Sequence, residues 1–272
     1  METIRRSYLN DFERCPRLFW YVNEQGIEVK PEVSAVVQRC GSYLHSLVAQ
    51  TGEQIYFSDT EERERRQVEI IYSCMLELEL IPQAQHEVYF TRQITENIAV
   101  EGTLDMVDGN WFGEMKYTSK PEYYLHTFSA QAQLEFYFFI SNLEFISNLE
   151  VASVLPIRQP SLRYQDGKED VEKFLGRLKD DVLKRPSFYF PYYDPDKMPK
   201  WGLKFYRHEF DMDEVEKRLR WWFKEIHKCR KFDYWPQRKQ NCLAPFECSY
   251  LPLCESGAFN EAIYRIKGEK GK

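Results

Sequence analysis

Asp105, Glu114 and Lys116 are the residues of this sequence whose types and spacing best suit a chemical reaction. Carboxylate oxygens are the ligands that magnesium and manganese prefer. A cation held between two carboxylates polarises a phosphodiester, offsets the charge that builds up on its oxygens and lowers the pKa of bound water. A neighbouring lysine can orient that water or stabilise the developing oxyanion. The three residues are therefore candidates for metal-dependent hydrolysis of phosphodiester bonds.

A β-hairpin is expected to position these residues. The strand-like stretches 98–107 and 110–117 flank Asp108-Gly109. Asp-Gly between two such runs is a strong signal for a two-residue hairpin loop. A solvent-facing hairpin of mixed charge would carry the same residues, so the hairpin alone does not establish a site.

The alternation of side chains decides which residues share a face of the hairpin. With this loop, Asp105 lies opposite Phe112, and cross-strand partners project from the same face. Asp105, Glu114 and Lys116 then share one face, with the two carboxylates as diagonal neighbours roughly 7–8 Å apart at the backbone. Two carboxylates at that separation can hold one divalent cation between them.

The rest of the chain alternates between helical and strand-like periodicity, which predicts an α/β fold. Ser58 and Glu61 resemble a capping box at the start of a helix. Helices are predicted over 7–21, 33–50, 58–80, 126–141, 168–184 and 212–231, and further strands over 86–94 and 151–157. We expect a central mixed sheet of four or five strands flanked by helices, with an N-terminal helical segment and a C-terminal cysteine-rich segment.

This pattern is interpreted as one domain over residues 1–272. It would comprise a mainly helical part over 1–82, a core over 83–160, and C-terminal helices with the cysteine segment over 161–272.

The composition limits the class of protein. Hydrophobic residues make up 43% of the 272 residues and aromatic residues 16%, which excludes a disordered chain. No apolar run of about 18 residues indicates a membrane span. The first residues lack the apolar segment of a secretion signal, so we expect a cytoplasmic protein without membrane contacts. The net charge of −6 argues against a basic surface over the whole chain, but a local basic groove for phosphates remains compatible with it.

The hairpin and the helix after it resemble the PD-(D/E)XK nuclease superfamily, in its RecB/AddB-like branch. In that family an aspartate on one strand precedes Glu-x-Lys on the next, a helix with Gln-x-x-x-Tyr follows, and many members carry an upstream Gly-x-x-x-His. The matching blocks here are GTLDMVDGNWFGEMKYTSK and QAQLEFYFF, with Asp105, Glu114-Met115-Lys116, Gln133 and Tyr137, and upstream Gly41 and His45. The resemblance covers most of the chain at low density and is strongest over 100–140.

The resemblance implies a restriction-endonuclease-like core with a magnesium or manganese site. Asp105 and Glu114 would bind the metal, together with the backbone carbonyl of Met115. His45 would be a further ligand through a neutral imidazole nitrogen, although a lone histidine on an apolar helix is also common as a structural residue. Lys116 would position the attacking water.

The helix after the hairpin would support this site. Gln133 and Tyr137 stand at i and i+4 on one helical face and would position the lysine or contact the DNA backbone. Gln131 is a competing choice, because Gln131 and Gln133 flank a single alanine. A core tyrosine and a surface glutamine would be the purely structural interpretation.

The cysteines point to a second metal centre. Without a secretion signal disulfides are not expected, and seven cysteines fit a four-cysteine site with three spare thiols. Cys242, Cys248 and Cys254 form a Cys-x5-Cys-x5-Cys array, and Cys15 lies far upstream. Cys40, Cys74 and Cys229 are interpreted as ordinary core cysteines.

One early and three late cysteines resemble the iron–sulfur subset of the same nuclease branch, which includes AddB-type and CRISPR-adaptation nucleases. The resemblance implies that four thiolates hold a 4Fe-4S cluster. The common tail of that subset is Cys-x2-Cys-x5-Cys, so the first gap here departs from it. Zinc is the alternative, although zinc sites usually show closer cysteine pairs, and unligated buried thiols are a third.

The stretch 218–239 is basic and aromatic, with eight lysines or arginines, two acidic residues and six aromatic residues. Basic side chains can follow a phosphate backbone, and aromatic rings can stack on unpaired bases. We expect the aromatic residues to belong mostly to the core and some of the basic residues to line a nucleic-acid surface.

These observations lead to one main hypothesis: a metal-dependent nuclease acting on DNA, as an exonuclease on single strands or free ends. The resemblance implies attack by water that leaves a 5′-phosphate and a 3′-hydroxyl. No Gly-x-x-x-x-Gly-Lys-Ser/Thr phosphate loop occurs, so any unwinding would need a helicase or another recombination or adaptation protein as partner. The alternatives are a non-catalytic DNA-binding or assembly protein with a structural iron–sulfur or zinc site, and a zinc-stabilised RNA-binding protein.

Overall fold

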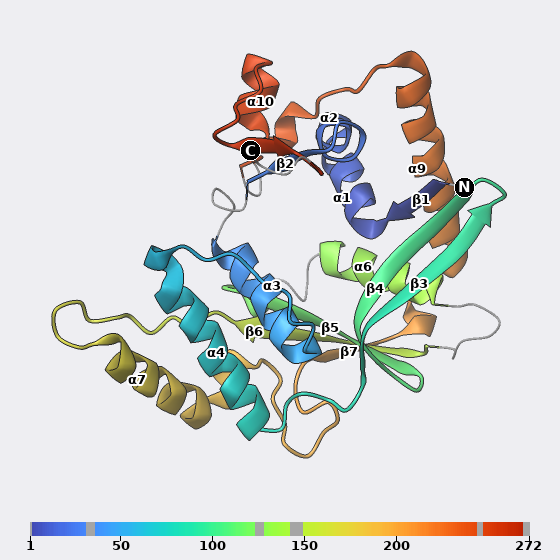
Figure 1. Ribbon diagram of the computed structural model, residues 1–272. Coiled ribbons are helices and arrows are strands. Elements are labelled where there is room, and N and C mark those ends of the chain that lie inside the picture. The colour runs from blue at the N-terminus through green and yellow to red at the C-terminus, as the bar shows by residue number, and fades with distance from the viewer. Residues whose placement is uncertain (1, 31–35, 123–127, 142–148, 244–246, 269–272) are drawn as a thin grey trace. The chain divides into compact units, whose positions relative to one another are not determined.

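The structure, a computed structural model, describes residues 2–30, 36–122, 128–141, 149–243 and 247–268 (Figure 1). The chain forms two compact units, each assembled from segments that are distant in sequence. Unit 1 comprises Met1–Ser34, Thr91–Gly102 and Met212–Lys272, and unit 2 comprises Ala35–Phe90 and Thr103–Asp211.

Unit 2 is built on a mixed β-sheet. The strand β5 (Trp111–Thr118) pairs antiparallel with β4 (Ile98–Asp108) and parallel with β6 (Val151–Arg158). On the outer sides, β7 (Leu203–Tyr206) pairs antiparallel with β6, and β3 (Gln85–Thr95) pairs with β4. The predicted α/β fold with a central sheet of parallel and antiparallel strands flanked by helices is therefore confirmed.

Helices cover both faces of this sheet. Met115, on one face of β5, packs in a core with residues of α3 (Val36–Ala49) and α4 (Glu62–Glu77). On the other face, the ring of Phe112 meets that of Phe138 in α6 (Phe128–Ile140) edge-on at 4.9 Å. Because side chains alternate along β5, α6 covers the face that also carries Glu114 and Lys116.

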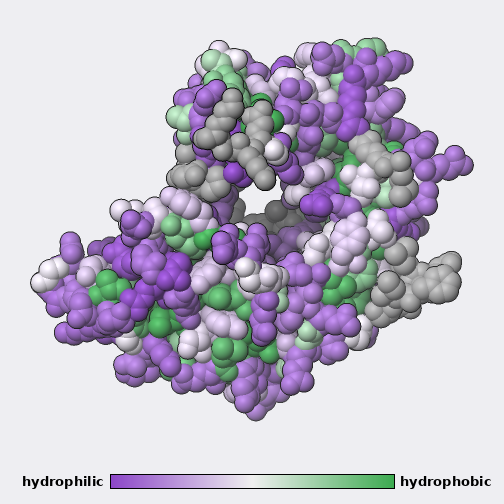
Figure 2. Space-filling model, viewed as in Figure 1, coloured by the Kyte–Doolittle hydropathy of each residue, from purple (hydrophilic) through white to green (hydrophobic). Residues whose placement is uncertain are grey.

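The burial of β6 follows from its place in the sheet. All residues from Ala152 to Ile157 are buried, because the strand is paired on both sides and covered on both faces. A continuous apolar run is typical of such a strand. The helices α7 (Val171–Lys184) and α8 (Pro186–Tyr189) and the short η3 (Arg207–Glu209) complete unit 2. Hydrophilic residues predominate over α7 in Figure 2.

The predicted capping box is present at the start of α4. The Ser58 amide donates to Glu61 Oε2 at 3.0 Å, and the short η2 (Asp59–Glu61) leads into the helix. The helix ends at Glu77 rather than at residue 80, and Glu79 adopts a left-handed conformation with φ of 52°. A residue in that conformation ends a helix in the manner of a C-cap.

The predicted single helix over 7–21 is wrong. The chain forms α1 (Arg6–Arg14), a break at Cys15, then α2 (Pro16–Phe19) and the π-helical turn η1 (Trp20–Glu24). Cys15 is extended, with φ of −166° and ψ of 121°, because the ring of Pro16 disfavours a helical conformation in the residue before it. The break separates the Cys15 thiol from the regular helical face.

Unit 1 joins the two ends of the chain. Its β1 (Glu2–Arg5) runs parallel to the start of β4, which brings the sheet to six strands among the described residues instead of four or five. β2 (Ile27–Val29) pairs antiparallel with β8 (Tyr264–Ile266). The long helix α9 (Met212–Phe232), the turn η4 (Lys239–Asn241) and α10 (Leu251–Ser256) complete it.

Hydrogen bonds and stacked rings hold the N-terminal helices of unit 1 to its C-terminal segment. Arg17 Nε donates to the Trp235 carbonyl at 3.0 Å, and the Phe19 and Trp235 rings stack with centroids 5.6 Å apart. The Tyr250 hydroxyl donates to the Ile27 carbonyl at 2.9 Å. None of the helices in the described ranges combines the length and apolarity required to cross a membrane.

Candidate active site

The hairpin turn of β4 and β5 differs from the expected one. Its loop is Gly109-Asn110, with Asp108 paired to Trp111, so the predicted Asp108-Gly109 loop is wrong. Gly109 has φ of 56° at the first loop position. Two-residue hairpin loops need a positive φ there, which glycine adopts without steric cost.

This register brings the two carboxylates closer than expected. Met106 pairs with Gly113, so the next position on each strand sets Asp105 directly beside Glu114 rather than diagonally. The shift relative to the expected register is two residues, and side chains repeat every two residues along a strand. Asp105, Glu114 and Lys116 therefore keep the common face that the sequence predicts.

Glu114 is the centre of a hydrogen-bond network. Its side chain is buried, with the residue only 2% exposed. Glu114 Oε1 forms an ion pair with the Lys116 ammonium and accepts a hydrogen bond from Gln133 Nε2 at 2.7 Å. Gln133 Nε2 also lies 3.0 Å from the Tyr137 hydroxyl. Of the two competing glutamines, Gln133 lies in this network, whereas Gln131 is exposed.

The second oxygen of Glu114 has no hydrogen-bond partner among the residues that the structure describes. Glu114 Oε2 is buried, and no hydrogen bond to it is formed within the described part of the chain. A buried carboxylate oxygen left unpaired costs free energy, because it has lost its hydration without replacement. An oxygen with lone pairs still available suits a cation ligand.

Two further groups, His45 and Glu87, lie beside Asp105. Ligand atoms of His45 on α3, Glu87 on β3 and Asp105 on β4 all lie within 4.8 Å of one another, with His45 Nδ1 3.4 Å from Asp105 Oδ1. Oxygen ligands stand about 2.0–2.6 Å from a magnesium or calcium ion, so two ligands of one ion lie no more than about 5 Å apart. The spacing of these atoms is compatible with one cation.

Met115 contributes through its backbone. Its amide donates to Asp105 Oδ2 at 2.7 Å, which fixes the orientation of that carboxylate. Its side chain, 2% exposed, packs in the core on the opposite face of β5.

Glu87 was not expected from the sequence. It lies in an alternating strand pattern that resembles an ordinary edge strand, and its side chain is exposed. Its backbone has φ of 51°, a left-handed conformation that is uncommon for glutamate. Such a conformation within a strand is a property of the folded chain, so only the presence of an acidic residue on the strand before Asp105 could have indicated it.

Burial and neighbouring charges set the protonation of the site. Burial, together with the charge of Asp105, raises the pKa of Glu114 to about 7 despite the nearby Lys116. Burial also favours the neutral form of Asp105, but the charge and hydrogen bond of His45 outweigh it and hold the Asp105 pKa below its ordinary value. Burial lowers the pKa of His45, but the charge of Asp105 and the hydrogen bond to it outweigh burial and raise that pKa above its ordinary value.

The raised pKa of Glu114 predicts a cost to stability without metal. A carboxyl whose pKa is higher in the folded than in the unfolded chain binds its proton more tightly when folded, so stability is lost as pH rises from about 4.5 to about 7. We expect Glu114→Gln to stabilise the metal-free protein at pH 8 by on the order of 2 kcal/mol, and much less at pH 5. Thermal unfolding of both proteins in a chelator at the two pH values measures this.

Asp108→Asn is the matched control, because Asp108 is an exposed carboxylate at the end of the same hairpin. Asp108→Asn should leave the difference in stability between pH 5 and pH 8 as it is in the parent protein. Equal effects of Glu114→Gln at pH 5 and pH 8 would contradict the raised pKa.

The four candidate cluster cysteines lie together in unit 1. Cys15, Cys242, Cys248 and Cys254 line one small pocket beside Arg17. The Arg238 amide lies 3.4 Å from Cys15 Sγ, and Gln237 Nε2 lies 3.1 Å from Cys254 Sγ. Burial and the neighbouring cysteines raise the pKa values of Cys242 and Cys254.

The other three cysteines lie elsewhere. Cys40 and Cys74 are buried in the core of unit 2, where burial raises the pKa of each thiol to about 11. Cys229 is half-buried on α9. The structure therefore separates the seven cysteines into a set of four in one pocket and three apart from it.

Comparison with protein-family models and with curated proteins finds no match for this chain. Its function is therefore inferred from the geometry and chemistry of its own residues.

Proposed function

We propose that this chain is a metal-dependent deoxyribonuclease of the PD-(D/E)XK type. One observation carries the proposal: a single polar site in unit 2 brings together seven side chains that suit this chemistry. They are those of His45, Glu87, Asp105, Glu114, Lys116, Gln133 and Tyr137. They come from two helices and three strands, so no local sequence preference explains their meeting. Glu114 Oε2, which is buried and accepts no hydrogen bond from the described residues, belongs to this site.

The donor set suits magnesium or manganese. Asp105 and Glu87 would offer carboxylate oxygens and His45 a ring nitrogen from one group of close ligand atoms, and Glu114, beside Asp105 but outside that group, would offer a further carboxylate oxygen. The resemblance adds the Met115 carbonyl. The cation would supply charge neutralisation at the phosphate and a bound water of lowered pKa.

The protein's own residues position the other reactants. Lys116 would donate to the scissile phosphate or to the attacking water, and its pairing with Glu114 Oε1 holds it beside the site. Gln133 fixes the Glu114 carboxylate, and Tyr137 fixes Gln133. In the proposed reaction the water oxygen bonds to phosphorus and the bond from phosphorus to the 3′ oxygen breaks, while one proton of the water passes to solvent and the leaving 3′ oxygen takes one proton from solvent. The products are a 5′-phosphate and a protonated 3′-hydroxyl.

Glu87 is proposed as a ligand of this cation beyond those that the resemblance implies. Removing one ligand is expected to weaken manganese binding by about 10–100-fold, similar to changes that disturb the support of a metal site. Calorimetric titration of the Glu87→Gln variant with manganese measures the change in affinity. Glu96→Gln removes an exposed carboxylate from the turn between β3 and β4 and should bind as the parent does. Equal affinities for Glu87→Gln and Glu96→Gln would exclude Glu87 from the site.

We further propose that the four-cysteine pocket of unit 1 holds a 4Fe-4S cluster rather than zinc. Zinc lies about 2.3 Å from each thiolate, so two thiolates on one zinc are at most about 4.6 Å apart. Among the described residues, no three of these sulfurs lie within 4.8 Å of one another. A cluster of several irons bridges more widely spaced thiolates than a single ion does, and cysteine is its usual ligand.

The substrate is proposed to be DNA that is single-stranded or has free ends, with any duplex opened by a partner helicase or another recombination or adaptation protein. The direct test is digestion of end-labelled linear and circular single-stranded DNA with manganese. Loss of label from linear DNA with intact circles supports exonuclease action. Cutting of circular DNA would indicate endonuclease instead of exonuclease action. If neither linear nor circular DNA is cut while metal is bound, the nuclease proposal is rejected.

A further inference from the structure

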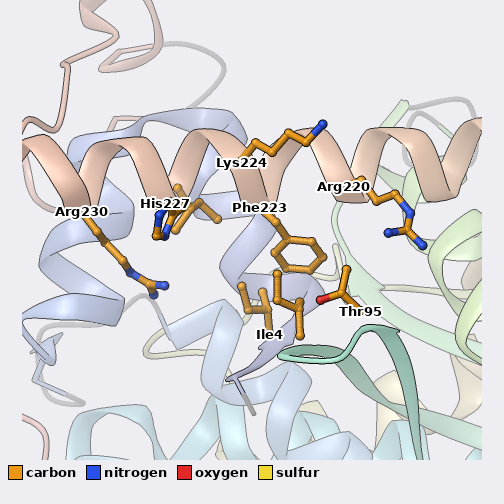
Figure 3. A pocket seen from close by; sticks show the side chains of 9 residues that line it. Ile4, Thr95, Arg220, Phe223, Lys224, His227 and Arg230 are labelled. Carbon is orange, nitrogen blue, oxygen red and sulfur yellow. The ribbon is translucent and has the colours of Figure 1, made fainter.

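A cavity in unit 1 has an apolar floor and a cationic wall. Its volume is about 320 Å³, and one face of α9 lines it together with Ile4 of β1 and with Thr95 and Ile98 of the β3–β4 hairpin (Figure 3). All of its lining residues belong to unit 1, whereas the proposed nuclease site lies in unit 2.

The floor of the cavity is well packed and apolar. Ile4, Phe223 and Ile226 are 2%, 6% and 1% exposed, and all three line it. Figure 3 shows the Phe223 ring directed from α9 towards Ile4 and Thr95. A ligand that fills this space must therefore present an apolar or aromatic part to the floor.

The wall carries basic side chains, and none of the described residues that line it is a carboxylate. Arg220, Lys224, His227 and Arg230 line the cavity, and Arg220, His227 and Arg230 follow one another along a single helical face at i, i+7 and i+10. At a rise of about 1.5 Å per residue, this row is about 15 Å long. Figure 3 shows Arg220 and Arg230 at its two ends, with Phe223 and His227 between them.

Acidic neighbours only partly neutralise this row. Arg220 donates from Nε and Nη2 to Glu216 Oε1, and Arg230 donates from the same two atoms to Glu24 Oε1. The side chains of Arg220 and Arg230 are still 44% and 34% exposed. A guanidinium carries five N–H donors, so Arg220 keeps donors for a ligand. Neither Lys224 nor His227 has a hydrogen-bond or ion-pair partner in the described ranges.

We propose that this cavity binds a phosphorylated nucleoside, with its phosphate against the basic row and its base and sugar over the apolar floor. Guanidinium groups match phosphate oxygens in geometry and charge, and an aromatic ring provides a surface on which a base can pack. The cavity is near the lower end of the range for ligand sites, about 300–1,000 Å³, which suits one nucleotide and is small for a long acyl chain. The nucleotide is either free or one unit of a strand.

Calorimetry on the intact protein tests this inference. Lys116→Ala is used without divalent metal, so that no cleavage occurs and failure of the nuclease proposal does not affect the result. Thymidine 5′-monophosphate is compared with thymidine and with inorganic phosphate. We expect the nucleotide to bind at least about tenfold more tightly than either part, because each part makes only one kind of contact.

Variants then locate the binding. Arg220→Gln combined with Arg230→Gln should weaken nucleotide binding by at least about tenfold through loss of charged hydrogen bonds. Lys228→Ala is the matched control, because Lys228 lies on the same helix, pairs with Glu225 and does not line the cavity. Ile98→Trp is a second test that fills the cavity from the β3–β4 hairpin without removing charge, and it should also weaken binding.

Two further arms identify the source of the nucleotide. If the site takes one unit of a strand, the double arginine variant will weaken binding of an oligothymidylate and lower its salt dependence by about two phosphate contacts. If the site takes free nucleotides, oligothymidylate binding will be unchanged while monophosphate binding is lost. Equal affinity for nucleotide and thymidine overturns the inference, as does parental affinity in the folded double variant or the Ile98→Trp variant.

Discussion

Replacing Lys116 by alanine is expected to lower the rate of the proposed manganese-dependent DNA cleavage by about 10²–10³-fold, the cost of losing one donor to developing negative charge. The Lys116 ammonium pairs with Glu114, the buried carboxylate at the centre of the site. Its loss removes a donor to the phosphate or the water and leaves Glu114 without its counter-charge. Single-turnover cleavage of labelled single-stranded DNA at saturating manganese measures the effect on the chemical step.

Lys120→Ala is the matched control for this experiment. Lys120 is an exposed lysine shortly after the end of β5, and its removal changes the net charge equally. It should cleave at nearly the parental rate. Cleavage by Lys116→Ala at the rate of Lys120→Ala would show that the site is not catalytic and would favour the alternative of a non-catalytic DNA-binding protein.

Replacing Cys15 by serine is expected to remove the proposed cluster and to lower the thermal midpoint by about 10 °C. A group present at a concentration far above its dissociation constant stabilises the folded chain by on the order of 4 kcal/mol. For a chain of this size, that free energy corresponds to roughly this shift in the thermal midpoint. Cys15 is the one cysteine of the pocket that lies at the start of the chain, so its loss separates the N-terminal helices from the shared group. Anaerobic purification, iron and zinc analysis and thermal unfolding provide the readouts.

Cys229→Ser is the corresponding control, because Cys229 also belongs to unit 1 but does not line the pocket. It should keep the parental iron content, the absorbance near 400 nm and the thermal midpoint. A colourless parent with stoichiometric zinc would replace the cluster by a zinc site. A parent with neither metal would reject both.

Much of the fold could be predicted from the periodicity of the sequence, and the exceptions have local causes. The capping box of Ser58 and Glu61 and the strands that carry Asp105 and Glu114 depend on contacts close in sequence. The single helix over 7–21 failed because the effect of Pro16 on Cys15 outweighed the helical periodicity. β1 could not be predicted, since a four-residue strand at the chain start is stabilised by pairing with residues 98–101.

The candidate site shows the same division. The common face of Asp105, Glu114 and Lys116 depends only on strand periodicity and survives the change of loop from Asp108-Gly109 to Gly109-Asn110. Only the family resemblance predicted that Gln133 and His45 lie close to these residues. The position of Glu87 follows from the pairing of β3 with β4 and from its left-handed backbone, neither of which the sequence displays.

The β3–β4 hairpin belongs to both units, which limits how the chain can be truncated or exchanged between proteins. Its base carries Glu87 and Asp105 in unit 2, while its tip, Thr91–Gly102, belongs to unit 1 and pairs with β1. A truncated chain that starts at residue 35 would leave the paired edge at Ile98–Glu101 bare, which invites association between molecules. The strands of the proposed metal site are thus not a transferable module, and an exchange of this core between proteins must carry a partner strand with it.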